Sequence, residues 1–164
     1  MTEKDYVEQT LQVKHKGIFN FDELYKTLVK WFTMYKYRVH EIEYKDYKED
    51  GKNMLYVKWE ANKKVTDYVK YVIETELNVN DFKEVMVNKK KNVEGEISMK
   101  FAGYMLKDYE EVWSRKGYMK FMREVYDKFL HGYKLAEMEK ELKDELYKVV
   151  NEVKSHLNLM KLKE

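Results

Sequence analysis

Cysteine and proline do not occur in this 164-residue sequence, and glycine occurs only six times. Without cysteine the chain has no disulfide, thiolate metal site or cysteine nucleophile, and a reducing compartment is the natural expectation. The glycines never cluster, which excludes a glycine-rich phosphate loop. No stretch reaches the roughly 20 apolar residues of a membrane span, and the first ten residues lack the apolar run of a signal peptide. We therefore expect a cytoplasmic protein without a membrane span.

Residue types that often act in catalysis or metal binding are present, but in no recognised arrangement. None of the four histidines, at positions 15, 40, 131 and 156, stands at a metal-ligand spacing. The serines lack a nucleophile elbow such as G-x-S-x-G. The acidic loop with Asp46, Glu49 and Asp50 lacks the spacing of an EF-hand and is more typical of a hydrated hairpin end. We predict no catalytic residue, metal or cofactor, and we favour binding over catalysis.

Charged residues make up 38% of the chain, but the net charge is only +2. Lysine and glutamate are interleaved, which is typical of a solvated surface. Tyrosines and lysines expected on one sheet face would suit single-stranded nucleic acid, where bases stack on aromatic rings. They are Tyr44, Tyr56, Tyr68, Tyr104, Lys58, Lys70 and Lys100. Glutamates on the same face, such as Glu60 and Glu74, would repel phosphate, so nucleic-acid binding is the least favoured alternative.

The first elements are predicted to be a strand and a helix. Residues 6–14 alternate in polarity with a period of two, which indicates a strand, and Gly17 should end it. Asn20 stands where a helix N-cap is expected, with Glu23 three residues later. Apolar residues then recur at helical spacing to Tyr35, which predicts an amphipathic helix.

A series of antiparallel strands should follow. Asp50-Gly51 is typical of a hairpin turn, and Leu55, Val57, Trp59 and Ala61 alternate along the returning strand. We expect a turn at residues 62–64, an interruption at 78–81, a short strand at 82–87, and a last strand reaching to about residue 113. The fold class is thus α+β, an antiparallel meander of about six strands with an early helix after the first strand.

The C-terminal part is predicted to be one long helix that is kinked at Gly132. Its first half, with the apolar stripe at residues 118–130, should cover the sheet. We expect a single domain over residues 1–164, with a core at about 4–131 and a helical extension at about 133–160.

This order of elements resembles the helix-grip superfamily, which includes START lipid-transfer domains and polyketide cyclases. The resemblance covers roughly residues 4–130. It implies an apolar or amphipathic small molecule bound between the sheet and the C-terminal helix. The residues that would line such a site are Trp59, Tyr71, Met99, Phe101, Phe121, Met122 and Val125. The same residues would also suit a solid core, and fold alone does not determine function.

The alternative is an assembly module. A second apolar stripe follows Gly132, and leaving it in water would be unfavourable. Its members are Leu135, Met138, Leu142, Leu146, Val149, Val153 and Leu157. If residues 118–130 already cover the sheet, this stripe must pack on the rest of the domain or on a second copy of the chain, and a homodimer is slightly favoured.

Overall fold

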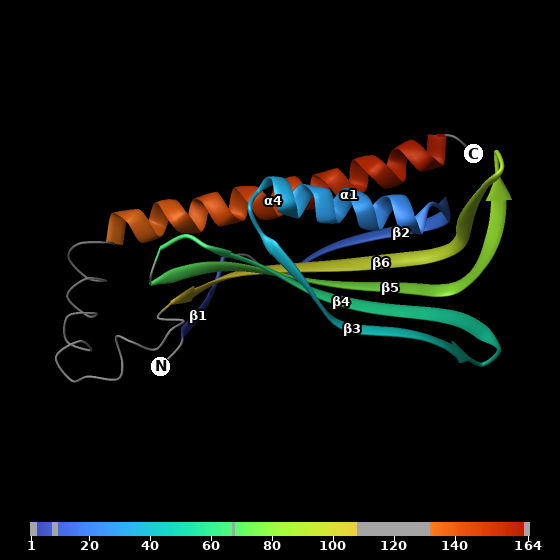
Figure 1. Cartoon of the computed structure of the whole chain (residues 1–164), viewed down its shortest axis with the longest axis horizontal. Coiled ribbons are helices and arrows are strands. Elements are labelled where there is room, and N and C mark those ends of the chain that lie inside the picture. Colours follow the sequence, from blue (N-terminus) through green and yellow to red (C-terminus); the bar gives the residue numbers. More distant parts are fainter. Residues whose placement is uncertain (1–2, 8–9, 67, 108–131, 163–164) are drawn as a thin grey trace.

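The computed structural model describes residues 3–7, 10–66, 68–107 and 132–162. The α+β prediction is confirmed: two helices lie on one face of a six-stranded antiparallel sheet (Figure 1). In chain order the elements are β1 (Glu3–Tyr6), β2 (Leu11–Phe19), α1 (Phe21–Met34), β3 (Arg38–Glu49), β4 (Lys52–Lys64), β5 (Val69–Val87), β6 (Lys90–Lys107) and α4 (Gly132–Leu162). Neither described helix is both long and apolar enough to cross a membrane.

The sheet has the order β1-β6-β5-β4-β3, and β2 also pairs with β6. The predicted first strand at residues 6–14 is therefore two strands, β1 and β2, that both lie along β6. Between them the amide of Val7 donates to the carbonyl of Gly103 at 3.1 Å. Gly17 does not end β2; it lies inside the strand, opposite Gly95.

The structure confirms one of the predicted turns and contradicts another. Asp50 and Gly51 both have positive φ, 52° and 77°, as a tight hairpin turn requires, and this prediction is confirmed. The turn expected at residues 62–64 is wrong, because β4 continues to Lys64. The chain reverses after it, where the Thr66 hydroxyl accepts hydrogen bonds from the amides of Tyr68 and Val69.

The interruption expected at residues 78–81 is also wrong. β5 runs without a break from Val69 to Val87, and only a bulge between Asn80 and Lys83 disturbs its pairing with β6. The described part of β6 ends at Lys107, so its predicted extension to residue 113 lies outside the described residues.

Helix α1 begins where the sequence indicates. The Asn20 side chain accepts a hydrogen bond from the Glu23 amide at 3.0 Å, which satisfies one of the free amides of the first turn. One face of the helix, with Leu24, Leu28 and Phe32, is buried in the core. The predicted cap and apolar stripe are both confirmed.

Helix α4 starts at Gly132 and lies along the same sheet face as α1 (Figure 1). Its apolar stripe belongs to the common hydrophobic core, with Leu135 and Met138 packed at the margin. Fully buried members are Leu142, Leu146, Val149, Val153 and Leu157. Of the two expected positions for this stripe, the rest of the domain or a second copy of the chain, the structure shows the first, because most of the stripe is buried on the chain's own sheet. Residues 118–130, the cover expected there, lie outside the described residues.

Candidate functional site

The hairpin end of β5 and β6 curves towards the helix side of the sheet (Figure 1). The bulge between Asn80 and Lys83 bends β5, and Asp81 has a positive φ of 51°. Opposite the bulge, Gly95 of β6 allows a close approach, since a Cβ there would lie 2.9 Å from the Cβ of Phe82. A bulge and a glycine therefore shape the curved end.

Polar contacts hold this curved end against its neighbours. Lys90 lies 3.8 Å from the carboxylate of Glu23 in the first turn of α1. From the adjacent strand, the Asn53 side-chain amide donates to the carbonyl of Phe82 at 3.1 Å. These contacts bring the hairpin end of the sheet and the start of α1 to opposite sides of a groove.

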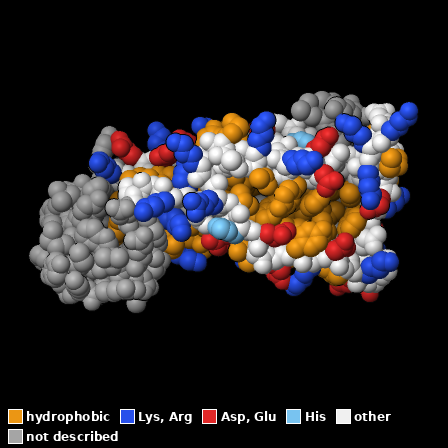
Figure 2. Space-filling view, in the orientation of Figure 1, with side chains coloured by type: hydrophobic (Ala, Val, Ile, Leu, Met, Phe, Trp, Pro, Cys, Tyr) orange, Lys and Arg blue, Asp and Glu red, His pale blue; other side chains and the backbone are white. Residues whose placement is uncertain are grey.

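The groove has a volume of about 190 Å³ and is open to solvent. Figure 2 shows an apolar patch in this region of the surface, with acidic side chains along its border. Its apolar lining comes from Phe21, Tyr44, Leu55, Val79, Phe82 and Val93, and its polar lining from Asn20, Asp22, Asp46, Glu84, Lys91 and Asn92. We call this feature the α1 groove.

Tyr44 reaches the α1 groove because β3 contains a bulge between Glu41 and Glu43. The bulge shifts the register, so that Tyr44 pairs with Val57 and Asp46 with Leu55, on the helix side of the sheet. The Tyr44 side chain is nevertheless 54% exposed. Its pKa is raised by partial burial and by the nearby carboxylates of Asp46, Glu41 and Asp22.

The polar groups of the α1 groove differ in how they are partnered. Glu84 and Lys91 form an ion pair at 3.1 Å. Asp22 and Asp46 form no ion pair within the described part of the chain. Asn92 is only 4% exposed, and its side-chain oxygen has no hydrogen-bond partner among the residues described here. Two carboxylates and one buried acceptor therefore remain uncompensated.

The ligand site predicted from the helix-grip resemblance lies elsewhere in the fold. Trp59, Tyr71, Met99 and Phe101 are at most 2% exposed, and they lie in the packed core rather than along the α1 groove. Trp59 packs edge to face against the Tyr25 ring at 5.1 Å. The other three predicted residues, Phe121, Met122 and Val125, lie outside the described residues.

The tyrosine and lysine face predicted for nucleic acid is also altered by the structure. Tyr44 lies on the opposite sheet face from Tyr56, because of the β3 bulge. Tyr68 and Tyr104 are buried at 3% exposure, and the Tyr104 hydroxyl donates to Glu74. The four tyrosines therefore do not form one exposed stacking surface.

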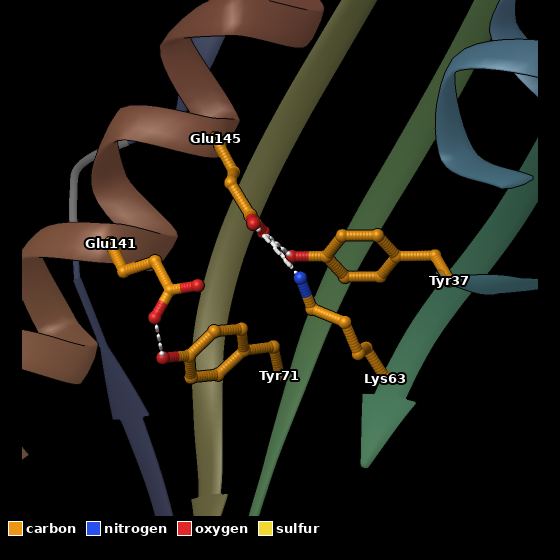
Figure 3. Close-up of polar contacts among 5 residues, drawn as sticks. All are labelled: Tyr37, Lys63, Tyr71, Glu141 and Glu145. Carbon is orange, nitrogen blue, oxygen red and sulfur yellow. Dashed lines mark hydrogen bonds and ion pairs between the residues drawn. The ribbon is translucent and has the colours of Figure 1, made fainter. Parts of the chain in front are cut away.

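A second polar feature ties α4 to the sheet (Figure 3). Lys63 of β4 donates to both carboxylate oxygens of Glu145, at 2.8 and 3.1 Å, and the Tyr37 hydroxyl donates to the same carboxylate at 2.5 Å. One helical turn away, the Tyr71 hydroxyl donates to Glu141 at 3.1 Å. We call these five residues the α4 anchor. The sequence does not show it, because its members come from four separate elements or loops.

The α4 anchor has the properties of a structural contact. The Lys63 ammonium lies 4.6 Å from the centre of the Tyr37 ring, which adds a cation–π attraction. Burial and the Glu145 carboxylate raise the pKa of Tyr37, and burial and Glu141 raise that of Tyr71. Both tyrosines stay protonated at neutral pH and are poorly suited to act as bases.

Comparison of the chain with protein-family models, curated proteins and solved structures finds no match. Among the described residues, no group of three or more histidine, aspartate or glutamate side chains is arranged to hold a metal ion. Within the described part of the chain, the α1 groove offers an open apolar surface and the α4 anchor a buried polar cluster.

Proposed function

We propose that this protein binds a small apolar or amphipathic molecule in the α1 groove. The observation that carries the proposal is an open groove whose floor is formed by Leu55, Val79 and Val93. Three aromatic side chains, Phe21, Tyr44 and Phe82, complete its apolar lining. Exposed apolar surface of this kind is unfavourable in water and commonly marks a binding site.

The size of the α1 groove limits the ligand. A cavity of about 150 Å³ holds one benzene molecule, and pockets for drug-sized ligands start at about 300 Å³. At about 190 Å³ the groove suits one ring or a short branched chain. Any further part of the ligand would extend into solvent, so the molecule is better described as a small amphiphile than as a two-chain lipid.

Binding is favoured over catalysis by the chemistry of the lining. Carboxylates, amides, one lysine and one phenol surround the apolar floor, and no histidine, serine or threonine is among the lining residues described. These groups can orient a ligand, but they do not make up a nucleophile, a base and an oxyanion donor.

This proposal places the ligand beside α1, whereas the helix-grip resemblance places it between the sheet and the C-terminal helix. The relation to that superfamily remains a prediction, as does a cytoplasmic location. The homodimer proposed through the C-terminal stripe loses its physical basis, because the stripe is already buried against the sheet.

Titration with a neutral probe tests the proposal. 2-Phenylethanol added to the full-length ¹⁵N-labelled protein should give saturable shifts in the amide signals of Phe21, Val79 and Val93. Tyr44→Ala should weaken binding at least threefold, because it removes the most exposed of the three aromatic side chains in the lining while leaving the core intact. Tyr47→Ala is the matched control, since Tyr47 is exposed on the other face of the same strand. Equal weakening by both variants, or shifts that do not saturate, would refute the proposal.

A further inference from the structure

The charges around the α1 groove do not balance. Glu84 and Lys91 neutralise each other at 3.1 Å, whereas Asp22 and Asp46 are left without an ion pair in the described part of the chain. The start of α1 contributes an opposing partial charge of about +0.5. The net charge at the groove is therefore about −1.5, and Glu41, close to Tyr44, makes the surroundings more negative.

A buried acceptor adds a second and independent observation. Asn92 lines the α1 groove with 4% exposure, and its side-chain oxygen has no partner among the residues described. A buried acceptor without a donor is unfavourable, and native structures contain few of them. A ligand whose N–H donor reached this oxygen would satisfy it, whereas an anionic ligand would not.

We propose that the ligand of the α1 groove is an amphipathic cation, with an apolar ring or chain on the groove floor and an ammonium or similar N–H cation at the rim. This inference rests on the proposed function. Asp22 and Asp46 supply the complementary charge, the exposed Tyr44 ring offers a cation–π contact, and Asn92 accepts a hydrogen bond.

The expected preference is moderate because the α1 groove is open to water. A cation about 5 Å from one carboxylate in bulk water gains a factor of about four in affinity. Two carboxylates acting together give about tenfold, after allowance for the opposing helix terminus. Salt screens this attraction, so the preference should shrink several-fold between about 20 mM and 500 mM ionic strength.

Three ligands of similar shape distinguish the contribution of charge to binding from that of apolar contact. They are 2-phenylethylammonium, 2-phenylethanol and 3-phenylpropionate. Their dissociation constants would be measured on the full chain by amide shifts at pH 7 and low salt. We expect the ammonium to bind about tenfold more tightly than the alcohol, and the carboxylate to bind more weakly than either. Combining Asp22→Asn with Asp46→Asn should bring the ammonium to the affinity of the alcohol and leave the alcohol unchanged.

The control is Glu43→Gln, which removes a carboxylate from the opposite face of β3, where Glu43 pairs with Lys58. It should leave the preference intact. Equal binding of all three ligands would refute the cation inference but support the proposed function. Tightest binding of the carboxylate, or a preference that survives loss of both aspartates, would also refute the inference. Binding of none of the three would refute the proposed function and the inference with it.

Discussion

Replacing Lys63 with methionine should destabilise the protein strongly, although it changes only one side chain at the end of a strand. The Lys63 and Glu145 side chains are 15% and 8% exposed, so both charges lie largely out of water. Methionine keeps much of the length and apolar character of lysine, but it leaves the Glu145 carboxylate with Tyr37 as its remaining partner in the α4 anchor. The substitution therefore leaves one buried carboxylate without its cation, and it also removes the contact of the Lys63 ammonium with the Tyr37 ring.

The size of the effect follows from the burial. Removing one partner of a buried ion pair costs about 3–5 kcal/mol, whereas a typical exposed pair contributes about 0–1 kcal/mol. Because Lys63 keeps some contact with solvent, we expect about 3 kcal/mol, the lower end of the buried range. Adding Glu145→Gln should recover about 2 kcal/mol of this loss, since the neutral amide still accepts from Tyr37 and no charge is stranded.

Urea unfolding followed by circular dichroism would measure these changes in the free energy of unfolding. Lys16→Met is the matched control, because Lys16 pairs with Glu96 at 3.4 Å but the two side chains are 83% and 57% exposed. It should change stability by no more than about 0.5 kcal/mol. If Lys63→Met costs as little as Lys16→Met, or if adding Glu145→Gln makes the variant still less stable, the α4 anchor is not a buried ion pair.

Three further outcomes are expected. Gly95→Ala should cost about 1–3 kcal/mol and weaken ligand binding, because the new Cβ meets the Phe82 backbone at 3.0 Å. Gly103→Ala, with its nearest neighbour at 3.4 Å, should cost less. Deleting residues 132–164 should leave an unfolded or aggregated chain by sedimentation and circular dichroism, since burial of each large apolar side chain of α4 is worth about 1.5–3 kcal/mol and five of them are fully buried. A folded monomer would contradict this. The raised pKa of Tyr37 implies a stabilisation that is complete below about pH 10 and lost as the pH rises further. Between about pH 10.5 and 11.5, the free energy of unfolding of Tyr37→Phe should therefore fall less steeply than that of the wild type, by about 1.4 kcal/mol per pH unit. Equal slopes for the two proteins would contradict the raised pKa of Tyr37.

The elements that the sequence predicts well are those specified by local chemistry. The cap at Asn20, the apolar stripe of α1 and the turn at Asp50-Gly51 depend on neighbouring residues alone, and the structure confirms all three. The α+β class also follows locally, because alternation and helical spacing are read over short windows. Strand ends were less accurate, since β4 and β5 continue through polar residues that look like turns but are paired across the sheet.

The surface on which the C-terminal stripe packs is harder to predict, because two apolar segments of the sequence could each cover the sheet. Both the stripe before Gly132 and the stripe after it have the spacing to cover a sheet. Periodicity shows that each needs apolar surroundings, but not which surroundings it finds. The structure places the second stripe, from Leu142 to Leu157, on the sheet face shared with α1. Only the contacts made across the fold distinguish a chain's own core from a surface for a partner.

The α1 groove could not be predicted from alternation at all. Strict alternation along β3 puts Tyr44 on the same face as Tyr56, where it suggested stacking for nucleic acid. The bulge between Glu41 and Glu43 reverses the parity from that point onward and turns Tyr44 and Asp46 to the helix side. No glycine or proline marks this bulge in the sequence, and its hydrophobic residue, Ile42, is 55% exposed. A one-residue irregularity therefore moves an aromatic ring and a carboxylate together into the groove, and the proposed cation site depends on that shift more than on any motif.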